Sequence, residues 1–451
     1  MHTTEFGVCD RALAPILALM VCLLGQGSAH AKVYEGCSEP SQAYANTLHA
    51  NTANLPTVLA QARGGDIVYL AGGDYGAVNL NRANADFITV AAEPGQTPVL
   101  SLLTVSGSHW RVRGLTVVGM AKPGFRGEWQ AHPYLVQLGD GDNFVIEDNE
   151  VASTLGPFPW AMEQAHVVNP SAGSSGIHAG NSSCVAISGN HVFNVFNGIQ
   201  AEGDQAGAHG KYYVISDNRI DDFAADGIDH SISEARITGN LITNGHDICN
   251  NLCIHMDGIQ GWNYYDRLGL VNTNVVIDSN IIIQRTVPAL ALAADDLHGI
   301  TIFDGVWRNV QITNNVVVTS TWHGISISGV DHLLIANNTV VASSDRPTWI
   351  QAGGVTHEGG ESSNVIVRNN IMTAQTPAKV RAIVPNMDID HNVVGVDPKR
   401  LFVKFDPAGG QFDLHLKPGS PAQGRGSPDG APPRDIEGKP RAKPINAGAY
   451  D

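Results

Sequence analysis

Residues 213–220 read YVISDNRI, in which apolar and polar side chains alternate before an asparagine is reached. This alternation is the period of a strand with one buried face. The asparagine falls where the strand must turn, and asparagine tolerates the left-handed backbone angles that turns require. The stretch therefore predicts a half-buried strand that ends at Asn218.

Phrases of the same form recur along most of the chain. They share the pattern apolar-x-apolar-x-x-Asn-x-apolar, and their asparagines are Asn149, Asn190, Asn218, Asn240, Asn280, Asn315, Asn338 and Asn370. Consecutive asparagines lie 22 to 41 residues apart. A strand repeat with a variable period and one asparagine per turn favours a parallel solenoid, whose rungs stack about 4.8 Å apart with equivalent side chains in columns. We expect the asparagines to hydrogen-bond along one column, and the longer periods to carry inserted loops.

A second repeat, Gly-Ile, occurs once per predicted rung, at residues 176–177, 198–199, 227–228, 258–259, 299–300 and 324–325. If each isoleucine points into the core, the residue after it points outward. That post-isoleucine column contains His178, Gln200, Asp229, Gln260, Thr301 and Ser326. The residues before each glycine form a parallel pre-glycine column, which contains Ser175, Asn197, Asp226, Asp257, His298 and His323.

Three aspartates gather in these columns. Asp226, Asp229 and Asp257 should lie within about two rungs, or roughly 10 Å, of one another. Such clustering is costly unless a cation, a shared proton or a substrate compensates the charge. His230 and His255 flank the same rungs. The pattern predicts a functional site here; the alternative is a solvated face whose acids cap turns.

The N-terminus has the form of a secretory signal. Arg11 precedes the apolar run 12–24, and Ala29-His30-Ala31 offers a cleavage site with small residues. The run is too short to span a bilayer, and no later segment could span one. We expect residues 1–31 to be removed and the protein to be periplasmic or secreted.

Four cysteines follow residue 31, and an even number in an exported chain fits two disulfides. Only three residues separate Cys249 from Cys253, so we pair these two, and Cys37 with Cys184. Buried thiols are the alternative, which an oxidising compartment disfavours.

The charge of the chain limits its partners. Charged residues make up 16% of the sequence, and the formal net charge is −16 at pH 7. Nucleic-acid binding needs a basic face, so nucleic acid is not expected as a partner. An acidic polysaccharide is not excluded, because a cleft can differ in sign from the whole protein.

The repeats, together with LPTVLAQARGGDIVYLAGGDYGAV (55–78), resemble the right-handed parallel β-helix superfamily of secreted polysaccharide-active enzymes. It includes pectate lyases, chondroitinase- and alginate-type lyases, polygalacturonases and alginate epimerases. The resemblance implies an all-β, single-stranded right-handed parallel β-helix. A short N-terminal helix would cap it, with Val58, Leu59 and Ala62 over the core. We expect the β-helix domain to span 32–395, and 396–451 to form a C-terminal extension that packs on the last coils.

The resemblance also implies a polysaccharide substrate, and we expect the protein to be a monomer. Two insertions, 155–175 and 246–255, are expected to wall a cleft along the Gly-Ile columns. The residues predicted to bind substrate are Gln200, Gln260, Trp262, Tyr264, Tyr265, Trp160 and His178. The residues predicted to carry the chemistry are Asp257, His255, His230, Asp226, Asp229, His323 and His298.

Three reactions fit such a site. A uronide lyase needs its substrate carboxylate neutralised and a base to remove the neighbouring proton. Asp226, Asp229 and Asp257 could hold Ca²⁺ for this purpose, with His255 or His230 as base. A hydrolase needs two carboxyl groups, and HMDGIQ (255–260) with WHGISISG (322–329) is similar to the polygalacturonase motifs. DGIDHS (226–231) is similar to a motif of alginate epimerases. We expect a lyase first and a hydrolase second, and a polysaccharide-binding adhesin is the non-enzymatic alternative.

Overall fold

The computed structural model describes residues 34–119, 134–156, 174–203, 210–246, 256–262, 270–286, 297–356, 360–373, 379–380, 384 and 386–451. The predicted signal peptide, residues 1–31, and the predicted Cys249–Cys253 pair lie outside this part of the chain. Within the described residues, no helix is long and apolar enough to cross a membrane.

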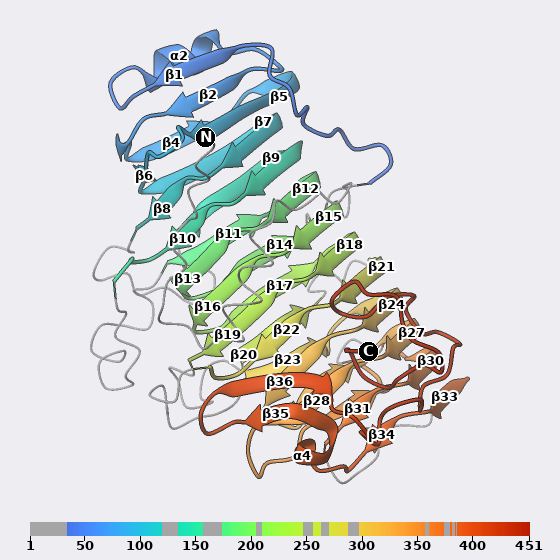
Figure 1. The fold of residues 1–451 in the computed structure, drawn as a ribbon. Coiled ribbons are helices and arrows are strands. Elements are labelled where there is room, and N and C mark those ends of the chain that lie inside the picture. Colours follow the sequence, from blue (N-terminus) through green and yellow to red (C-terminus); the bar gives the residue numbers. More distant parts are fainter. Residues whose placement is uncertain are drawn as a thin grey trace.

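The chain winds into a stack of parallel strands (Figure 1). In the part of the chain that the structure describes, a 22-stranded sheet and a 12-stranded sheet contain all the strands except one antiparallel hairpin. Strand β9 (Tyr134–Glu147) pairs with β11 through its first residues and with β12 through its last, so the larger sheet bends into two faces. The right-handed parallel β-helix predicted from the sequence is therefore confirmed as the fold class.

The described strands of the solenoid lie on three faces, and β7 and β9 each extend over two of them. The first face contains β4 (Ala77–Leu80), the first part of β7 (Leu102–Arg113), the first part of β9, β11 (Ser175–Ala179), β14 (Ile199–Glu202), β17 (Asp226–Ser231), β20 (Met256–Gly261), β23 (Leu297–Ile302), β26 (His323–Ile327), β29 (Trp349–Ala352) and β32 (Lys379–Val380). The second face contains β1 (Thr47–Ala50), β2 (Ile67–Leu70), β5 (Ala83–Ala92), the last parts of β7 and β9, β12 (Ser182–Ser188), β15 (Lys211–Ser216), β18 (Ser233–Thr238), β21 (Val271–Asp278), β24 (Val306–Thr313), β27 (Val330–Ala336), β30 (Ser363–Arg368) and β33 (Met387–Asp390). The third face contains β3 (Gly73–Asp74), β6 (Pro98–Leu100), β8 (Thr116–Val118), β10 (Glu150–Ala152), β13 (His191–Val195), β16 (Arg219–Phe223), β19 (Leu241–Gly245), β22 (Ile281–Ile283), β25 (Val316–Thr319), β28 (Thr339–Ala342), β31 (Ile371–Met372) and β34 (Val393–Val394).

The asparagine ladder forms as predicted at the turn between the second and third faces. Asn240 shows the pattern: its Oδ1 accepts from the backbone N and from Nδ2 of Asn218, both over 3.0 Å. Its own Nδ2 donates to Asn280 Oδ1 over 2.9 Å and to Ile215 O over 2.9 Å. The same links join Asn149, Asn190, Asn218, Asn240, Asn280, Asn315, Asn338, Asn370 and Asn392. All of these side chains except the half-buried Asn392 are buried, so the ladder satisfies polar groups that would otherwise destabilise the turns.

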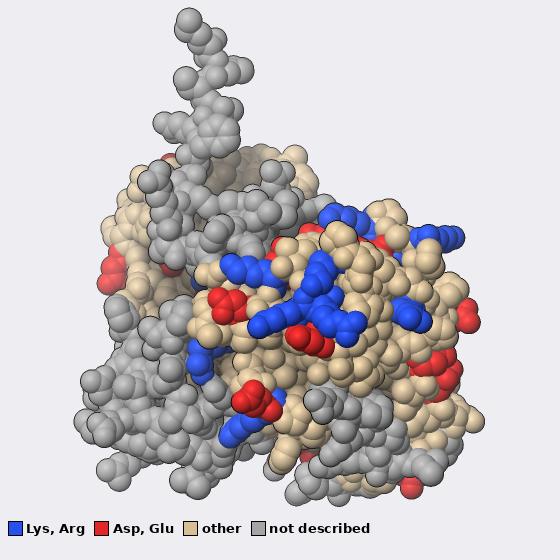
Figure 2. Space-filling model, turned by 60° about the horizontal axis from the view of Figure 1, so that its bottom comes forward, with Lys and Arg blue, Asp and Glu red and all other residues tan. Residues whose placement is uncertain are grey.

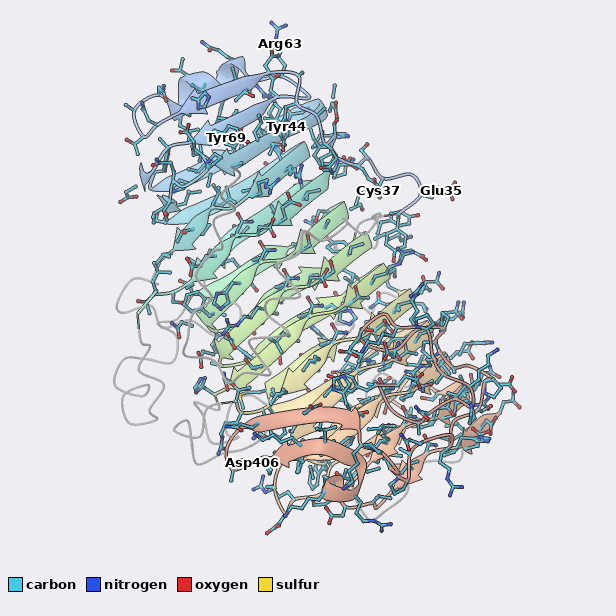
Figure 3. All side chains as sticks on the ribbon, viewed as in Figure 1. Glu35, Cys37, Tyr44, Arg63, Tyr69 and Asp406 are labelled. Carbon is cyan, nitrogen blue, oxygen red and sulfur yellow. A yellow bond between two sulfur atoms is a disulfide. The ribbon has the colours of Figure 1, made fainter. Side chains whose placement is uncertain are left out.

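A short helix, α2 (Leu55–Gln61), closes the N-terminal end of the core. Leu55 and Ala62 are buried there, and Val58 and Leu59 pack against the same apolar cluster. The capping helix predicted from residues 55–62 is thus present. The N-terminal segment before it runs along the second face, where Figure 3 labels Glu35 and Cys37. Cys37 is joined to Cys184, as predicted, with 5.5 Å between their Cα atoms.

The segment after β34 folds back over the third face. It contains α4 (Pro398–Leu401) and the hairpin β35 (Phe402–Asp406) and β36 (Gln411–Leu416). Apolar side chains of the segment form a second buried cluster with outward-facing third-face residues; the cluster includes Leu241, Ile281, Val316, Val318, Val341, Leu401, Phe402, Leu414 and Tyr450. This explains continuous apolar runs such as Ile281–Ile283, which are covered on both sides.

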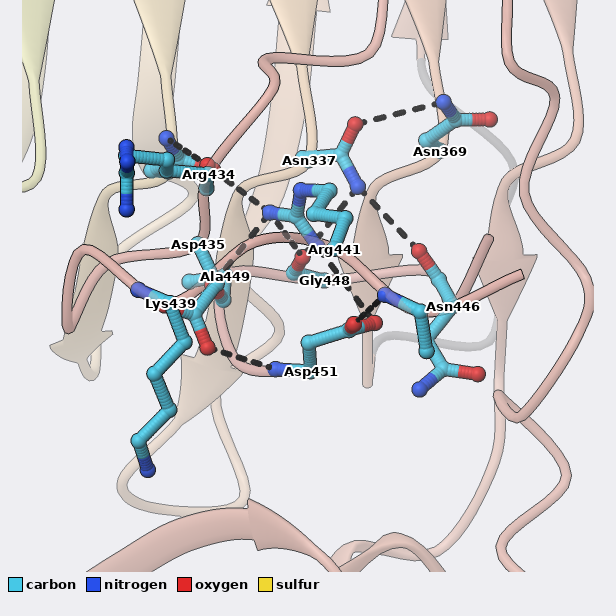
Figure 4. Close-up of polar contacts among 12 residues, drawn as sticks. Asn337, Asn369, Arg434, Asp435, Lys439, Arg441, Asn446, Gly448, Ala449 and Asp451 are labelled. Atoms are coloured by element: carbon cyan, nitrogen blue, oxygen red, sulfur yellow. Dashed lines mark hydrogen bonds and ion pairs between the residues drawn. The ribbon is translucent and has the colours of Figure 1, made fainter. Parts of the chain in front are cut away.

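Polar contacts fix the final stretch of the chain to the ladder turns (Figure 4). Arg441 is 8% exposed, and its Nη2 donates to Asn314 Oδ1 over 2.5 Å. Asn337 Nδ2 donates to the Asn446 carbonyl over 3.1 Å, and Asn369 Nδ2 donates to the Ser427 carbonyl over 2.9 Å. Lys and Arg side chains gather on the face seen in Figure 2, which is the end of the molecule that carries this segment. The described first-face strands from β4 to β29, in contrast, contain no Lys or Arg.

Candidate active site

The two Gly-Ile columns lie on the first face in the register that the sequence predicts. In the post-isoleucine column, His178 pairs with Gln200, Gln200 with Asp229, and so on through Gln260, Thr301, Ser326 and Gln351. In the pre-glycine column, Asp226 pairs with Asp257, and Asp257 pairs with His298. We call the outer surface made by these two columns, from Ser175 to Gln351, the site surface.

Glycine is required between the columns for a steric reason. A Cβ on Gly299 would lie 2.0 Å from the carbonyl oxygen of Gly324 and 2.5 Å from a methyl group of Val317. Val317 belongs to the third face, so the strand turns its backbone toward the core at this point. This bend lets the residue before the glycine and the residue after the isoleucine reach the same surface, as the contacts of Asp257 show.

Asp257 lies at the centre of the site surface. Its side chain is fully buried, and its Oδ1 accepts from Thr301 Oγ1 over 2.7 Å and lies 3.1 Å from His298 Nδ1. Its backbone N donates to Asp226 Oδ1 over 3.0 Å. With Asp257 ionised, its oxygen only accepts hydrogen bonds, which places the imidazole proton of His298 on Nδ1. Nε2 is then the basic nitrogen of the ring.

A second histidine follows on the next rung. The rings of His298 and His323 lie 4.6 Å apart at 61°, and His323 Nδ1 lies 2.8 Å from Ser326 Oγ. Phe303 and Trp322 contact His323 edge-on, with ring centroids at 5.2 Å and 5.6 Å. The two predicted histidines are thus brought together with Asp257, and aromatic rings surround the second of them.

Asp229 occupies the rung before Asp257 and differs from it in environment. It is 5% exposed, and its Oδ1 has no hydrogen-bond partner. Burial, followed by the neighbouring charges of Asp226 and Glu202, raises the pKa of Asp229 well above its ordinary value, while a hydrogen bond from Trp262 opposes the shift. The structure therefore favours the neutral acid at Asp229, whereas Asp257 has the hydrogen bonds that suit a carboxylate.

The N-terminal end of the site surface carries two residues that the sequence did not reveal. Tyr134 stacks on His178 with 4.4 Å between ring centroids and donates its hydroxyl hydrogen bond to Gln200. Burial raises the pKa of Tyr134, so its phenol stays protonated. Glu202 lies 3.6 Å from His178 Nε2. The strand of Tyr134 lacks Gly-Ile, but its pairing with Ser175 places it in the pre-glycine column.

His230 was expected on the site surface, and this placement is wrong. Its side chain is fully buried in the core, where its ring lies edge-on to Trp307 with 5.5 Å between centroids. It follows outward-facing Asp229, so the strand alternation turns it inward, in register with Ala201 and Gly261. Glycine at 261 leaves room for the ring, because a Cβ there would lie 3.3 Å from His230 Nε2.

The remaining predicted residues divide into two groups. Gln260 lies near the end of β20, Trp262 directly follows this strand, and both are half-buried. His255, Trp160, Tyr264 and Tyr265 lie outside the described residues. No group of three or more His, Cys, Asp or Glu side chains in the described ranges is arranged to hold a metal ion. Calcium at Asp226, Asp229 and Asp257 therefore stays a prediction.

Comparison with known proteins finds similarity in structure. No protein-family model matches the chain, and no curated protein matches it in sequence. The pectate lyase Pel9A aligns at 13% identity with a TM-score of 0.50, over 92% of this chain and 97% of that one. An alginate lyase from Paenibacillus sp. aligns at 18% identity and a TM-score of 0.45, over 71% and 99% of the two chains. A family 6 polysaccharide lyase from Pseudopedobacter saltans aligns at 13% identity and a TM-score of 0.45, over 84% and 98%. At such identities the likeness concerns architecture, and this chain shares the parallel β-helix fold of pectate lyase Pel9A.

Proposed function

We propose that the protein is an exported enzyme that acts on a polysaccharide, and that it cleaves an acidic, uronate-containing chain by β-elimination. The observation that carries the proposal is the contact between Asp257 and His298 on the site surface. A buried carboxylate that fixes an imidazole by Nδ1 leaves Nε2 as a general base. The shared fold with pectate lyase Pel9A agrees with a polysaccharide substrate.

The proposed reaction uses this base directly. His298 Nε2 takes the proton next to the substrate carboxyl group, the electron pair forms a carbon–carbon double bond, and the bond to the leaving oxygen breaks. The imidazolium formed at His298 then supplies the proton that the leaving oxygen needs. Asp257 orients the ring and stabilises its charged form, as a hydrogen-bonded carboxylate does for a catalytic histidine.

The substrate carboxylate must be neutralised for its neighbouring proton to become acidic. The described site surface is itself acidic, with Glu202, Asp226, Asp229 and Asp257 on consecutive rungs. A neutral Asp229 can donate a hydrogen bond to the substrate carboxylate instead of repelling it. Calcium held by Asp226, Asp229 and Asp257 is the other proposal, and it would supply the same neutralisation through oxygen ligands.

A hydrolase is the second candidate, because the environments of two neighbouring carboxyl groups differ. Asp229 is held neutral by burial and neighbouring charge, and Asp257 accepts two hydrogen bonds. In glycosidases, a protonated carboxyl group next to an ionised one identifies the general acid and the general base. An epimerase would share the proton abstraction of the lyase and return the proton to the opposite face.

The test is to incubate the mature protein with polygalacturonate, alginate and chondroitin sulfate, with calcium or with a chelator. Ultraviolet absorbance of the unsaturated product and the number of reducing ends are followed together. A lyase raises both, whereas a hydrolase raises reducing ends alone. Loss of activity in chelator, restored by calcium, would support the cation; binding without any new ends would contradict a cleaving enzyme. An epimerase is then recognised by NMR.

A further inference from the structure

We propose that Trp322 forms the platform of a distal sugar-binding subsite, two rungs from Asp257 toward the C-terminal end of the site surface. This inference rests on the proposed function and specifies how the polysaccharide lies. Its ligand is one pyranose ring of the bound chain, and the chain runs along the solenoid axis across successive rungs.

The first observation is the exposure of Trp322. It is 58% exposed, more than any other aromatic side chain that the structure describes. It lies immediately before β26, and thus at the edge of the site surface next to His323. An aromatic face is a good partner for the apolar face of a sugar ring.

The second observation is that Trp322 continues a row of rings. From Asp257, the row passes through His298 and His323 to Trp322, and Trp322 lies 6.5 Å from Trp349 on the following rung, tilted by 32°. The rungs are about 4.8 Å apart, so Trp322 lies roughly 10 Å along the axis from the rung of Asp257. A pyranose unit advances a polysaccharide by close to one rung, so the platform meets a ring about two units from the reacting bond.

The third observation is an unsatisfied polar group on the same part of the surface. Gln351 follows Ser326 in the post-isoleucine column, is 3% exposed, and its Nε2 has no hydrogen-bond partner. A buried donor of this kind is costly unless something accepts from it. A sugar hydroxyl or carboxylate placed beside Trp349 would do so. The subsite therefore combines an apolar platform with a polar group that needs a partner.

The test measures binding in the Asp257→Asn background, in which the ligand is not cleaved. Calorimetry is performed with size-fractionated oligosaccharides of polygalacturonate and alginate, from dimers to chains of ten or so units. Trp322→Ala should weaken the binding of long chains on the order of tenfold or more. The effect should shrink as the chain becomes too short to reach two rungs beyond Asp257. Trp322→Phe should recover part of the loss.

Tyr212→Ala is the matched control, because Tyr212 is 37% exposed on β15 of the second face. It should bind chains of every length as the Asp257→Asn protein does. Equal binding by the Trp322→Ala protein at all lengths would overturn the subsite, and so would a loss that is the same for dimers and long chains. If no oligosaccharide binds to any of these proteins, the proposed function fails and the subsite fails with it.

Discussion

Nδ1 of His298 lies 3.1 Å from Oδ1 of Asp257, on a carboxylate that has no exposed surface. The two residues are direct neighbours in the pre-glycine column, on β20 and β23. The strand pairing, not a flexible loop, therefore sets the orientation of the imidazole. Preorganisation of this kind lets one carboxylate control the protonation state of one ring.

Asp257→Asn should lower turnover on the order of 10²-fold or more, because the amide no longer stabilises a charged His298. The thermal midpoint should stay the same or rise, since one charge leaves an acidic cluster. Asp142→Asn, at an exposed second-face position, is the control and should keep full activity. Near-normal turnover of the Asp257→Asn protein would show that Asp257 has only a structural role in β20.

Asp229 should make the protein less stable as the pH rises. Its pKa is raised in the folded state, so the folded protein binds the proton more tightly than the unfolded chain. The stabilisation is present below the unfolded pKa and is lost as the pH rises through the folded pKa, by at most about 1.4 kcal/mol per pH unit. Denaturant unfolding of Asp229→Asn should show a flatter profile over that interval. Parallel profiles for the two proteins would contradict a buried neutral acid.

His230 should have the opposite effect at acid pH. Burial lowers its pKa to about 3, from an ordinary value of 6.5. The unfolded chain therefore takes up a proton that the folded core excludes, and stability falls as the pH drops from about 6.5 toward 3. His230→Leu should remove this part of the acid sensitivity, which denaturant titrations between these pH values would detect. His391→Leu, at a half-exposed turn, should leave it in place.

The ladder should be sensitive to the loss of a single asparagine. Asn240→Ala leaves the side-chain donors of Asn218 and the side-chain acceptor of Asn280 with fewer partners inside the protein. We expect the free energy of unfolding to fall by about 3 kcal/mol or more. Asn309→Ala is the comparison. Asn309 lies in β24 with a φ of 58°, and its side chain donates to Asn274 at the surface, so alanine should cost about 1 kcal/mol there, mainly for the left-handed backbone. Similar thermal midpoints for the two variants would rule out a special contribution from the ladder.

Non-reducing peptide maps of the exported protein should contain two disulfides, one between two peptides and one within a single peptide. One joins Cys37 to Cys184, which ties the N-terminal segment to β12. The other joins Cys249 to Cys253, because only three residues separate them and export favours oxidation. Alkylation of all four thiols without prior reduction would count against both the pairing and export.

The repeats predicted the fold because the same residue type is needed at the same position of every turn. The ladder asparagine and the glycine of Gly-Ile occupy positions where other residues would leave a buried group unpaired or would clash. Such requirements can be read from a single sequence, since stacking repeats them in register. The order Asp226, Asp257, His298 along one column followed from the same register.

The site was harder to predict where a residue with a reactive side chain falls on the inward-facing side of its strand. The alternation that places Asp229 outward also places His230 inward, and Gly261 opposite it was the signal that room existed for the ring. Tyr134 was missed because its strand has no Gly-Ile, and Glu202 because it lies beyond the repeated motif. The protonation of Asp229 depends on burial among other acids, which no linear pattern contains.

The C-terminal segment contacts Asn314, Asn337 and Asn369, so it fits only a solenoid with a fixed number of coils between these residues. These residues have positive φ values of 55°, 56° and 60°, at positions where earlier turns have glycine, aspartate or serine. All three donate hydrogen bonds to carbonyl groups of the C-terminal segment. The distances between the three asparagines along the solenoid must therefore match the distances between these carbonyl groups. A coil duplicated before Leu241, the first residue that packs against this segment, would lengthen the solenoid and leave that fit intact. A coil inserted between Asn314 and Asn369 would move one docking point by about 4.8 Å and break it. Insertion or deletion of whole coils is thus compatible with the fold in the N-terminal part of the solenoid and destabilising in the C-terminal part.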